Sequence, residues 1–144
     1  MNSIRLLALD LEATLIDDAM TARPRPGLNA FLSFCNERFE RLALLTTVDE
    51  PTARAVLDEL AEHREIPGVV ADRIEYIEWE GQYKDLRNAN NVALDETLLV
   101  DDDQGWIHPE QFDRWVPIAP WRGGMDTELE RVQSELASRL SGDG

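Results

Sequence analysis

Short apolar runs recur along the chain, and each is followed at once by a polar residue. The runs are Ile4–Leu9, which is apolar after Arg5, Leu42–Leu45 and Thr97–Val100, and the residues that follow them are Asp10, Thr46 and Asp101. Short continuous runs of this kind are typical of parallel strands that are buried on both faces of a sheet. We predict a strand at each run, a further short strand over residues 115–119, and a half-exposed strand or hairpin over residues 73–79.

Longer stretches with apolar residues at helical spacing separate these runs. One predicted helix begins near Pro26, where apolar residues recur three and four positions apart. A second is expected from Pro51 to about His63, with Asp49 as its N-cap. A short helix over residues 86–92 and a terminal amphipathic helix over residues 125–140 complete the pattern, whereas a loop is expected around Gly68, leading to Val69 and Val70.

Strands that alternate with helices indicate an α/β fold. We expect a three-layer, Rossmann-like parallel sheet of about five strands flanked by helices. Residues 1–144 should form one domain, because 144 residues is a usual size for a single domain. Parallel sheets of this class bind ligands beyond the carboxyl ends of their strands. Asp10, Thr46 and Asp101 should therefore meet at one edge of the sheet.

The charge balance narrows the range of partners. Lys and Arg number 14 against 29 Asp and Glu, which gives a formal net charge of −15 at pH 7. A chain this acidic repels polyanions, so we expect no binding to nucleic acid. The apolar run at the N-terminus is too short for a signal sequence or a membrane span, and the one cysteine, Cys35, has no partner for an intramolecular disulfide. We therefore expect a cytoplasmic protein that does not bind membranes.

The polar residues suit the cleavage of a phosphate ester, which needs a nucleophile, a cation, donors for the phosphoryl oxygens and an acid for the leaving group. The Asp10 carboxylate can attack phosphorus, and Glu12 can protonate the departing oxygen. Thr46 can donate a hydrogen bond to the phosphoryl group, and Lys84 can pair with that group or with the nucleophile. Together these side chains supply the catalytic functions that the reaction needs.

The carboxylates can also hold Mg²⁺, which prefers oxygen ligands. Asp10 has a second oxygen for the metal, Asp102 is the favoured direct ligand, and Asp101 is expected to support it. Taken singly, such residues are more often caps, turn residues or surface charges. Their joint occurrence at successive strand ends favours the catalytic interpretation.

The same residues occur in the order of the four motifs of the haloacid dehalogenase-like superfamily. Asp10–Thr14 resembles the first motif, Asp-x-Asp-x-Thr, Leu42–Thr46 resembles the second, Lys84 the third and Leu98–Asp102 the fourth. The segment Arg25–Leu28, followed by Phe31 and Leu32, is similar to the capless branch that includes carboxy-terminal-domain phosphatases of the NIF type. The resemblance extends from Leu6 to about Trp121.

This resemblance implies a Mg²⁺-dependent phosphatase that forms an aspartyl-phosphate on Asp10. Its catalytic residues would be Asp10, Glu12, Thr46 and Lys84, and its metal residues Asp10, Glu12, Asp101 and Asp102, with residue 12 contributing its backbone carbonyl. The intervals between motifs are too short for a large cap domain, so the site should be open. An open site suits a phosphoprotein segment or another large phosphomonoester. The oligomeric state is left open.

Glu12 departs from the aspartate of the family motif. Its additional methylene displaces the carboxyl by about 1.5 Å, which is enough to slow a reaction about 100-fold. A second interpretation is therefore a phosphate-binding or regulatory module that has kept the fold and the metal but lost turnover. A receiver domain of phosphorelay signalling also combines Asp, Thr and Lys over Mg²⁺, but its acidic pair follows the first strand, whereas here the pair follows Lys84.

Several neighbouring residues are assigned structural roles. The Thr14 hydroxyl is expected to fix the loop after Asp10. Asp17 and Asp18 are expected in a solvated turn. Burial of aromatic area is the expected role of Trp106, Trp115 and Trp121.

Overall fold

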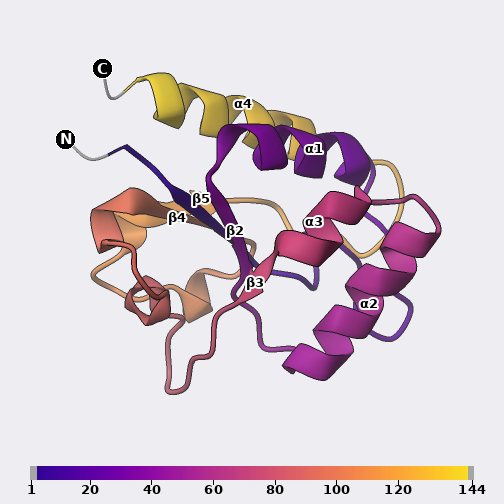
Figure 1. Ribbon diagram of the computed structural model, residues 1–144, viewed down its shortest axis with the longest axis horizontal. Coiled ribbons are helices and arrows are strands. Elements are labelled where there is room, and N and C mark those ends of the chain that lie inside the picture. Colours follow the sequence, from indigo (N-terminus) through magenta and orange to yellow (C-terminus); the bar gives the residue numbers. More distant parts are fainter. Residues whose placement is uncertain (1–2, 143–144) are drawn as a thin grey trace.

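The apolar runs form the strands of one parallel sheet, which the computed structural model describes within residues 3–142 (Figure 1). The strands are β1 (Leu6–Leu9), β2 (Arg41–Leu44), β3 (Glu75–Tyr76), β4 (Thr97–Asp101) and β5 (Trp115–Pro117). The α-helices are α1 (Leu28–Arg38), α2 (Glu50–Glu62), α3 (Gly68–Arg73) and α4 (Glu128–Ser141). Short 3₁₀ turns occupy Leu86–Asn88, Leu94–Glu96, Gln104–Trp106 and Phe112–Arg114.

The order of the strands is β3-β2-β1-β4-β5, and every pair is parallel. Leu9 of the central strand β1 lies opposite Val100 of β4, so Asp10, the next residue, comes level with Asp101. The Asp10 amide donates to the Val100 carbonyl at 3.0 Å. From β1 the chain adds β2 and β3 on one side of the sheet and then β4 and β5 on the other, so the strand order reverses at β1. In α/β sheets, ligands bind beyond the carboxyl ends of the strands at such a reversal.

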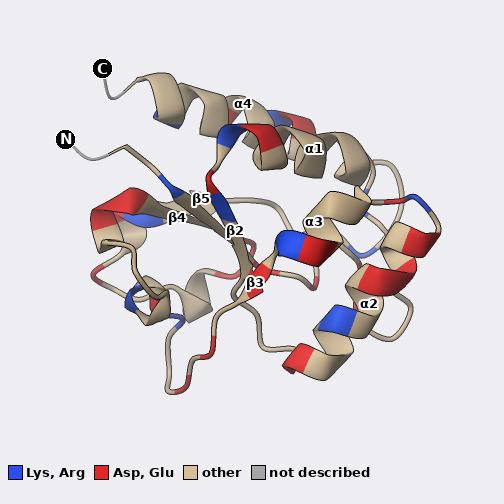
Figure 2. Ribbon diagram, in the orientation of Figure 1, with Lys and Arg blue, Asp and Glu red and all other residues tan. Residues whose placement is uncertain are grey.

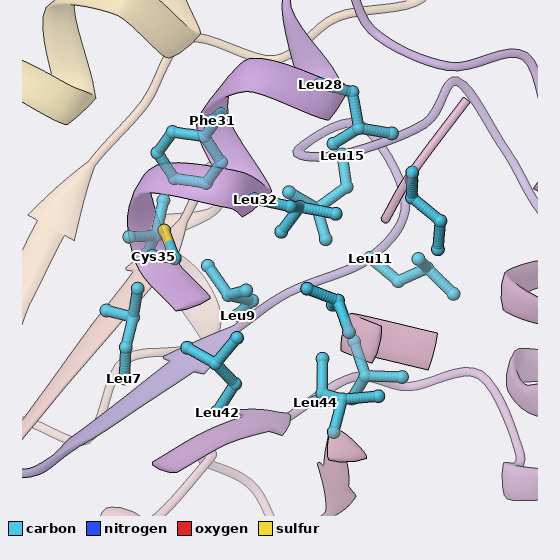
Figure 3. Packing of buried hydrophobic residues seen from close by; sticks show 14 of the residues in the cluster. Leu7, Leu9, Leu11, Leu15, Leu28, Phe31, Leu32, Cys35, Leu42 and Leu44 are labelled. Atoms are coloured by element: carbon cyan, nitrogen blue, oxygen red, sulfur yellow. The ribbon is translucent and has the colours of Figure 1, made fainter. Parts of the chain in front are cut away.

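Alternate residues of β1 point to opposite faces of the sheet and enter two separate cores. Leu7 and Leu9 lie in the larger core, where Phe31 and Leu32 of α1 pack near them (Figure 3). All four α-helices contribute buried residues to this core. Each fully buried leucine contributes about 1.5–3 kcal/mol through the hydrophobic effect.

The second face of the sheet is covered by the segment between β3 and β5 rather than by an α-helix. Its core consists of Leu6, Ala8, Ala43, Leu45, Ile77, Leu86, Ala89, Leu99 and Ile107. The outer layer on this side is thus made of loops and 3₁₀ turns. The predicted fold class, a layered α/β parallel sheet without a large cap domain, is confirmed.

The starts of the helices follow from local chemistry. Asp49 caps α2 as predicted, because its carboxylate accepts a hydrogen bond from the Thr52 amide at 3.1 Å. Gly27 has a φ of 84°, a left-handed conformation that delays the start of α1 to Leu28. Gly123 and Gly124 also have positive φ, and α4 begins at Glu128 instead of residue 125.

Two predictions on the segment 68–92 were wrong, and a third holds only over a shorter range. Residues 68–73 form α3 rather than a loop, because Val70 and Ala71 pack into the helical core. The strand predicted over residues 73–79 is reduced to Glu75–Tyr76. The helix predicted over residues 86–92 is a single 3₁₀ turn over Leu86–Asn88, which ends because Ala89 adopts an extended conformation.

Acidic residues outnumber basic ones by 29 to 14. Figure 2 marks the positions of acidic residues along α2 and in the loops, with basic residues distributed among them. None of the helices within residues 3–142 combines the length and the apolar character needed to cross a lipid bilayer.

Candidate active site

Three carboxylates meet at the carboxyl edge of the sheet. Asp10, Asp101 and Asp102 each place an oxygen within 4.8 Å of the others. Asp10 and Asp101 are 6% and 0% exposed, and Asp102 is half-buried. Carboxylates this close repel one another unless a cation lies between them. We call these three residues the carboxylate cluster.

Lys84, the one lysine of the chain, reaches into the carboxylate cluster. Its Nζ donates to Asp10 Oδ1 at 2.9 Å and to Asp101 Oδ2 at 2.6 Å, and the side chain is fully buried. The Lys84 amide donates to the Trp106 carbonyl at 2.8 Å, which ties this segment to the loop after β4. The backbone bridge therefore places the ammonium between the ends of β1 and β4.

Burial and charge together set the ionisation of the cluster. Burial raises the pKa of Asp10 to about 8, although the Lys84 ammonium opposes this effect. Burial also raises the pKa of Asp101, again against Lys84. Burial acts to lower the pKa of Lys84, but the two carboxylates outweigh it and raise the pKa. If all three carboxylates were ionised beside the ammonium, the cluster would carry two negative charges, which a divalent cation would balance.

Thr14 links Asp10 to Asp102. Its Oγ1 lies 3.0 Å from Asp10 Oδ2 and 3.0 Å from Asp102 Oδ1, and the residue is fully buried. Thr14 lies within a tight turn over residues 13–16, in which Ala13 has a left-handed φ of 63° and donates its amide to the Ile16 carbonyl at 2.7 Å. Thr14 was expected to fix the loop, and its hydroxyl also orients two carboxylates.

Glu12 and Thr46 lie close to the cluster without bonding to it. The Glu12 carboxylate accepts a hydrogen bond from the Ala19 amide at 2.7 Å. Thr46 is 1% exposed, and its Oγ1 accepts from the Val48 amide at 3.2 Å. Within residues 3–142, neither side chain forms a hydrogen bond to the carboxylate cluster or to Lys84.

A cavity of about 160 Å³ opens over the cluster. Of the predicted site residues, Asp10, Glu12, Lys84 and Asp102 line it, whereas Thr46 and Asp101 do not. The lining also includes five residues outside the predicted site, which are Ala13, Thr47, Asp103, Trp106 and Arg122. Ala13, Thr47 and Asp103 are next to motif residues in the sequence, so that position could have indicated that they line the site. Trp106 and Arg122 carry no such signal, because tertiary structure brings their segments to the site.

Arg25 fixes the loop that carries Ala13 and Thr14. It is 1% exposed, pairs with Asp126 at 2.7 Å, and donates to the carbonyl oxygens of Ala13 and Thr14, both at 3.2 Å. It also donates to the Ala119 carbonyl at 2.6 Å. One buried guanidinium thus joins the loop after β1 to the segment between β5 and α4.

Asp17 is buried and paired, so its placement in a solvated turn was wrong. Its carboxylate accepts from Arg23 Nε at 2.7 Å and from the amides of Asp18 and Arg23 at 2.7 and 2.8 Å. Burial acts to raise the pKa of Asp17, but the hydrogen bonds from Thr21 and Arg23 outweigh it and hold the pKa below its usual range. Asp17 therefore stabilises the turn as an ionised group.

The sequence comparison agrees with this geometry. Residues 5–143 match the family described as NLI interacting factor-like phosphatase. A comparison with curated proteins finds no match. The matched range contains all five strands, the carboxylate cluster and Lys84. It confirms the resemblance to haloacid dehalogenase-like phosphatases of the NIF type. The chain therefore belongs to the NLI interacting factor-like phosphatases and is a hydrolase of the haloacid dehalogenase-like class.

Proposed function

We propose that the protein is a Mg²⁺-dependent phosphomonoester hydrolase in which Asp10 attacks phosphorus and forms an aspartyl-phosphate. The environment of Asp10 carries this proposal. Its carboxylate follows the central strand, is almost fully buried, and is held by Lys84 at one oxygen and Thr14 at the other. A nucleophile with fixed orientation and little surrounding water reacts faster than a mobile, hydrated one.

Asp10 and Asp102 are the proposed side-chain ligands of Mg²⁺, and the backbone carbonyl of Glu12 is a third. Both oxygens of Asp101 are already used, because they accept from Lys84 Nζ and from the Asp103 amide. Asp102 is half-buried and uses one oxygen, toward Thr14. This difference supports Asp102 as the ligand and Asp101 as its support. The ion would neutralise charge on the phosphoryl oxygens.

The remaining roles are assigned to Thr46, Lys84 and Glu12. The Thr46 hydroxyl accepts from the Val48 amide, which leaves its own hydrogen for a phosphoryl oxygen. Lys84 holds the nucleophile in place and supplies positive charge. Glu12 lines the cavity and, when protonated, can give a proton to the leaving oxygen. Once ionised, the same carboxylate can accept a proton from the water that hydrolyses the aspartyl-phosphate.

The proposed substrates are phosphorylated protein segments or other large phosphomonoesters. No large cap domain lies between the elements of residues 3–142, so an extended substrate can reach the cavity. The net charge of −15 argues against nucleic acid as a partner. Because Cys35 is buried and unpaired, a reducing compartment such as the cytoplasm is the proposed site of action.

Hydrolysis of an aryl phosphate in the presence of Mg²⁺ tests the proposal. Asp10→Asn should abolish turnover while leaving the circular dichroism spectrum unchanged, because the variant lacks the attacking carboxylate. Removal of the metal with a chelator should silence the wild-type enzyme. Asp58→Asn is the matched control, because Asp58 is exposed on α2. Turnover by Asp10→Asn, or turnover without metal, would contradict the mechanism.

The contact between Glu12 and the Ala19 amide favours a second candidate, a phosphate-binding or regulatory module without turnover. A carboxylate held away from the cluster would leave the leaving group without its acid. Binding of beryllofluoride with Mg²⁺, but no cleavage of any phosphomonoester, would support the module. If the length of the Glu12 side chain limits phosphomonoester hydrolysis, Glu12→Asp should raise the rate of that hydrolysis. A lower rate would mean that glutamate is suited to this cavity.

A further inference from the structure

Nearly every cationic side chain of this acidic protein has a partner. The arginines that pair with carboxylates are Arg5, Arg23, Arg25, Arg41, Arg54, Arg87, Arg114, Arg131 and Arg139. Arg73 donates to Asn36, and Arg38 stacks on Phe34. Within residues 3–142, Arg64 and Arg122 are the two whose guanidinium groups form no hydrogen bond, ion pair or ring contact.

These two arginines lie in different places. Arg64 follows α2, whereas Arg122 lines the cavity over the carboxylate cluster. The other cation in the cavity lining, Lys84, is already bound to Asp10 and Asp101. Among the residues that the structure describes at this cavity, Arg122 is thus the cation that remains available to an incoming anion.

The backbone that carries Arg122 is fixed from several sides. The Trp121 amide donates to the Ala13 carbonyl at 2.9 Å, and its indole Nε1 donates to the Gly124 carbonyl at 3.0 Å. The Arg122 carbonyl accepts from Arg23 Nη2 at 3.4 Å. Gly123 has a φ of 137°, which an L side chain rarely adopts. These contacts hold the backbone, so that only the exposed side chain of Arg122 is left to reorient.

A phosphate ester meets an unfavourable potential at this site. The protein has a net charge of −15, and Glu12, Asp102 and Asp103 add carboxylates to the cavity lining. A dianion therefore needs cationic groups that are not already neutralised. Arginine suits this role because its planar guanidinium binds phosphate oxygens through two parallel hydrogen bonds.

We propose that Arg122 binds the phosphate group of the substrate through its guanidinium. This inference rests on the proposed function, because it assumes that a phosphomonoester occupies the cavity. Arg122 contributes affinity for the phosphate, and it is distinct from the residues that attack phosphorus or hold the metal.

Steady-state kinetics with an aryl phosphate and Mg²⁺ test this role. Arg122→Ala should raise KM about tenfold to a hundredfold, because hydrogen bonds to a charged group are lost. The apparent inhibition constant of inorganic phosphate should rise with it. Arg122→Lys should restore part of the affinity, since it keeps the charge but loses the paired donors. Because Arg122 is exposed and unpaired, the melting temperature should not change.

Arg64→Asn provides the matched control. It removes the same charge from the other unpaired arginine, and asparagine tolerates the left-handed φ of 60° at this position. KM should change less than twofold in this variant. An Arg122→Ala variant with the KM and phosphate inhibition of Arg64→Asn would overturn the proposal. So would a fall in kcat with unchanged phosphate affinity, because Arg122 would then not contact the bound phosphate.

A binding measurement separates this inference from the proposed function. Calorimetric titration of inorganic phosphate into wild-type and Arg122→Ala protein with Mg²⁺ reports binding even if no turnover occurs. Absence of Asp10-dependent hydrolysis would end the proposed function alone. Equal phosphate affinity of the two proteins would end the assignment of Arg122 alone.

Discussion

At the scale of the single residue, one hydroxyl orients the two proposed metal ligands. Thr14 Oγ1 is 3.0 Å from an oxygen of Asp10 and 3.0 Å from an oxygen of Asp102. Thr14→Val keeps the shape of the side chain but removes the hydroxyl. The Mg²⁺ concentration required for half-maximal activity should rise about tenfold to a hundredfold, as is usual when support of a metal ligand is lost.

Magnesium titrations of aryl phosphate hydrolysis measure this effect. Thr14→Ser, which retains the hydroxyl, is the control and should stay within a few-fold of the wild type. If Thr14→Val needed no more Mg²⁺ than the wild type, the hydroxyl would not orient the ligands.

Asp17 gives a pH-dependent prediction at the same scale. Its pKa is lowered in the folded state, so its ionised form stabilises the fold above about pH 4, the ordinary pKa of aspartate, and this contribution is lost as the pH falls further. Asp17→Asn should lower the free energy of unfolding by about 1.5–3 kcal/mol at pH 7. The difference from the wild type should shrink below pH 4, because the unfolded wild-type chain then binds a proton at Asp17 while the folded protein still holds the carboxylate ionised.

Urea unfolding at pH 7 and at about pH 3, roughly one unit below the ordinary pKa of aspartate, measures this difference. Asp58→Asn, at an exposed position of α2, should show no such pH dependence. A difference between Asp17→Asn and the wild type that stays constant with pH would contradict the assignment.

At the scale of secondary-structure elements, Arg25 connects three segments that are separate in sequence. Its guanidinium contacts the loop after β1, the segment after β5 and Asp126, which lies before α4. Arg25→Met removes the charge but keeps much of the side-chain volume. It should destabilise the protein by about 3–5 kcal/mol, because the half-buried partner Asp126 and the carbonyl oxygens lose their donor.

Thermal or urea unfolding measures this loss. Arg87→Met is the control. The Arg87 side chain is 55% exposed and pairs with Asp85, and exposed ion pairs of this kind contribute about 0–1 kcal/mol to stability. If the two variants were equally stable, Arg25 would not hold the segments together.

At the scale of the whole molecule, we propose that residues 1–144 form one domain, because both cores pack on the same sheet. Figure 1 shows α1 and α4 side by side although they are far apart in sequence, and they are in contact. All four α-helices pack into one core, whereas Trp79 and Trp115 pack against the other. Circular dichroism reports mainly on the helices, and two of the four tryptophans report on the second core, so the two signals weight the two layers differently.

Both signals should follow one urea transition with the same midpoint, because neither layer can keep its core after the sheet is lost. Two separate midpoints would contradict a single cooperative domain. As a control, thermal unfolding is monitored by circular dichroism and tryptophan fluorescence. The two thermal transitions should again coincide.

The sequence by itself determined the features that depend on neighbouring residues. Apolar runs that end at Asp10 and Asp101 predicted buried strands with carboxylates at their tips, because a strand needs only a short continuous run to be recognised. The N-cap at Asp49 was equally local. The order of the motifs also allowed Lys84 to be placed with Asp10, although 74 positions separate them in sequence.

Only the tertiary structure decided which residues complete the site. Arg122 and Trp106 reach the cavity because loops after different strands meet there, and no periodicity in the sequence records that meeting. The pairing of buried Asp17 with Arg23, and the packing that makes residues 68–73 a helix, also depend on contacts outside the local pattern. Local propensity is weak compared with the free energy of burying a side chain in a particular place, so these features follow from packing.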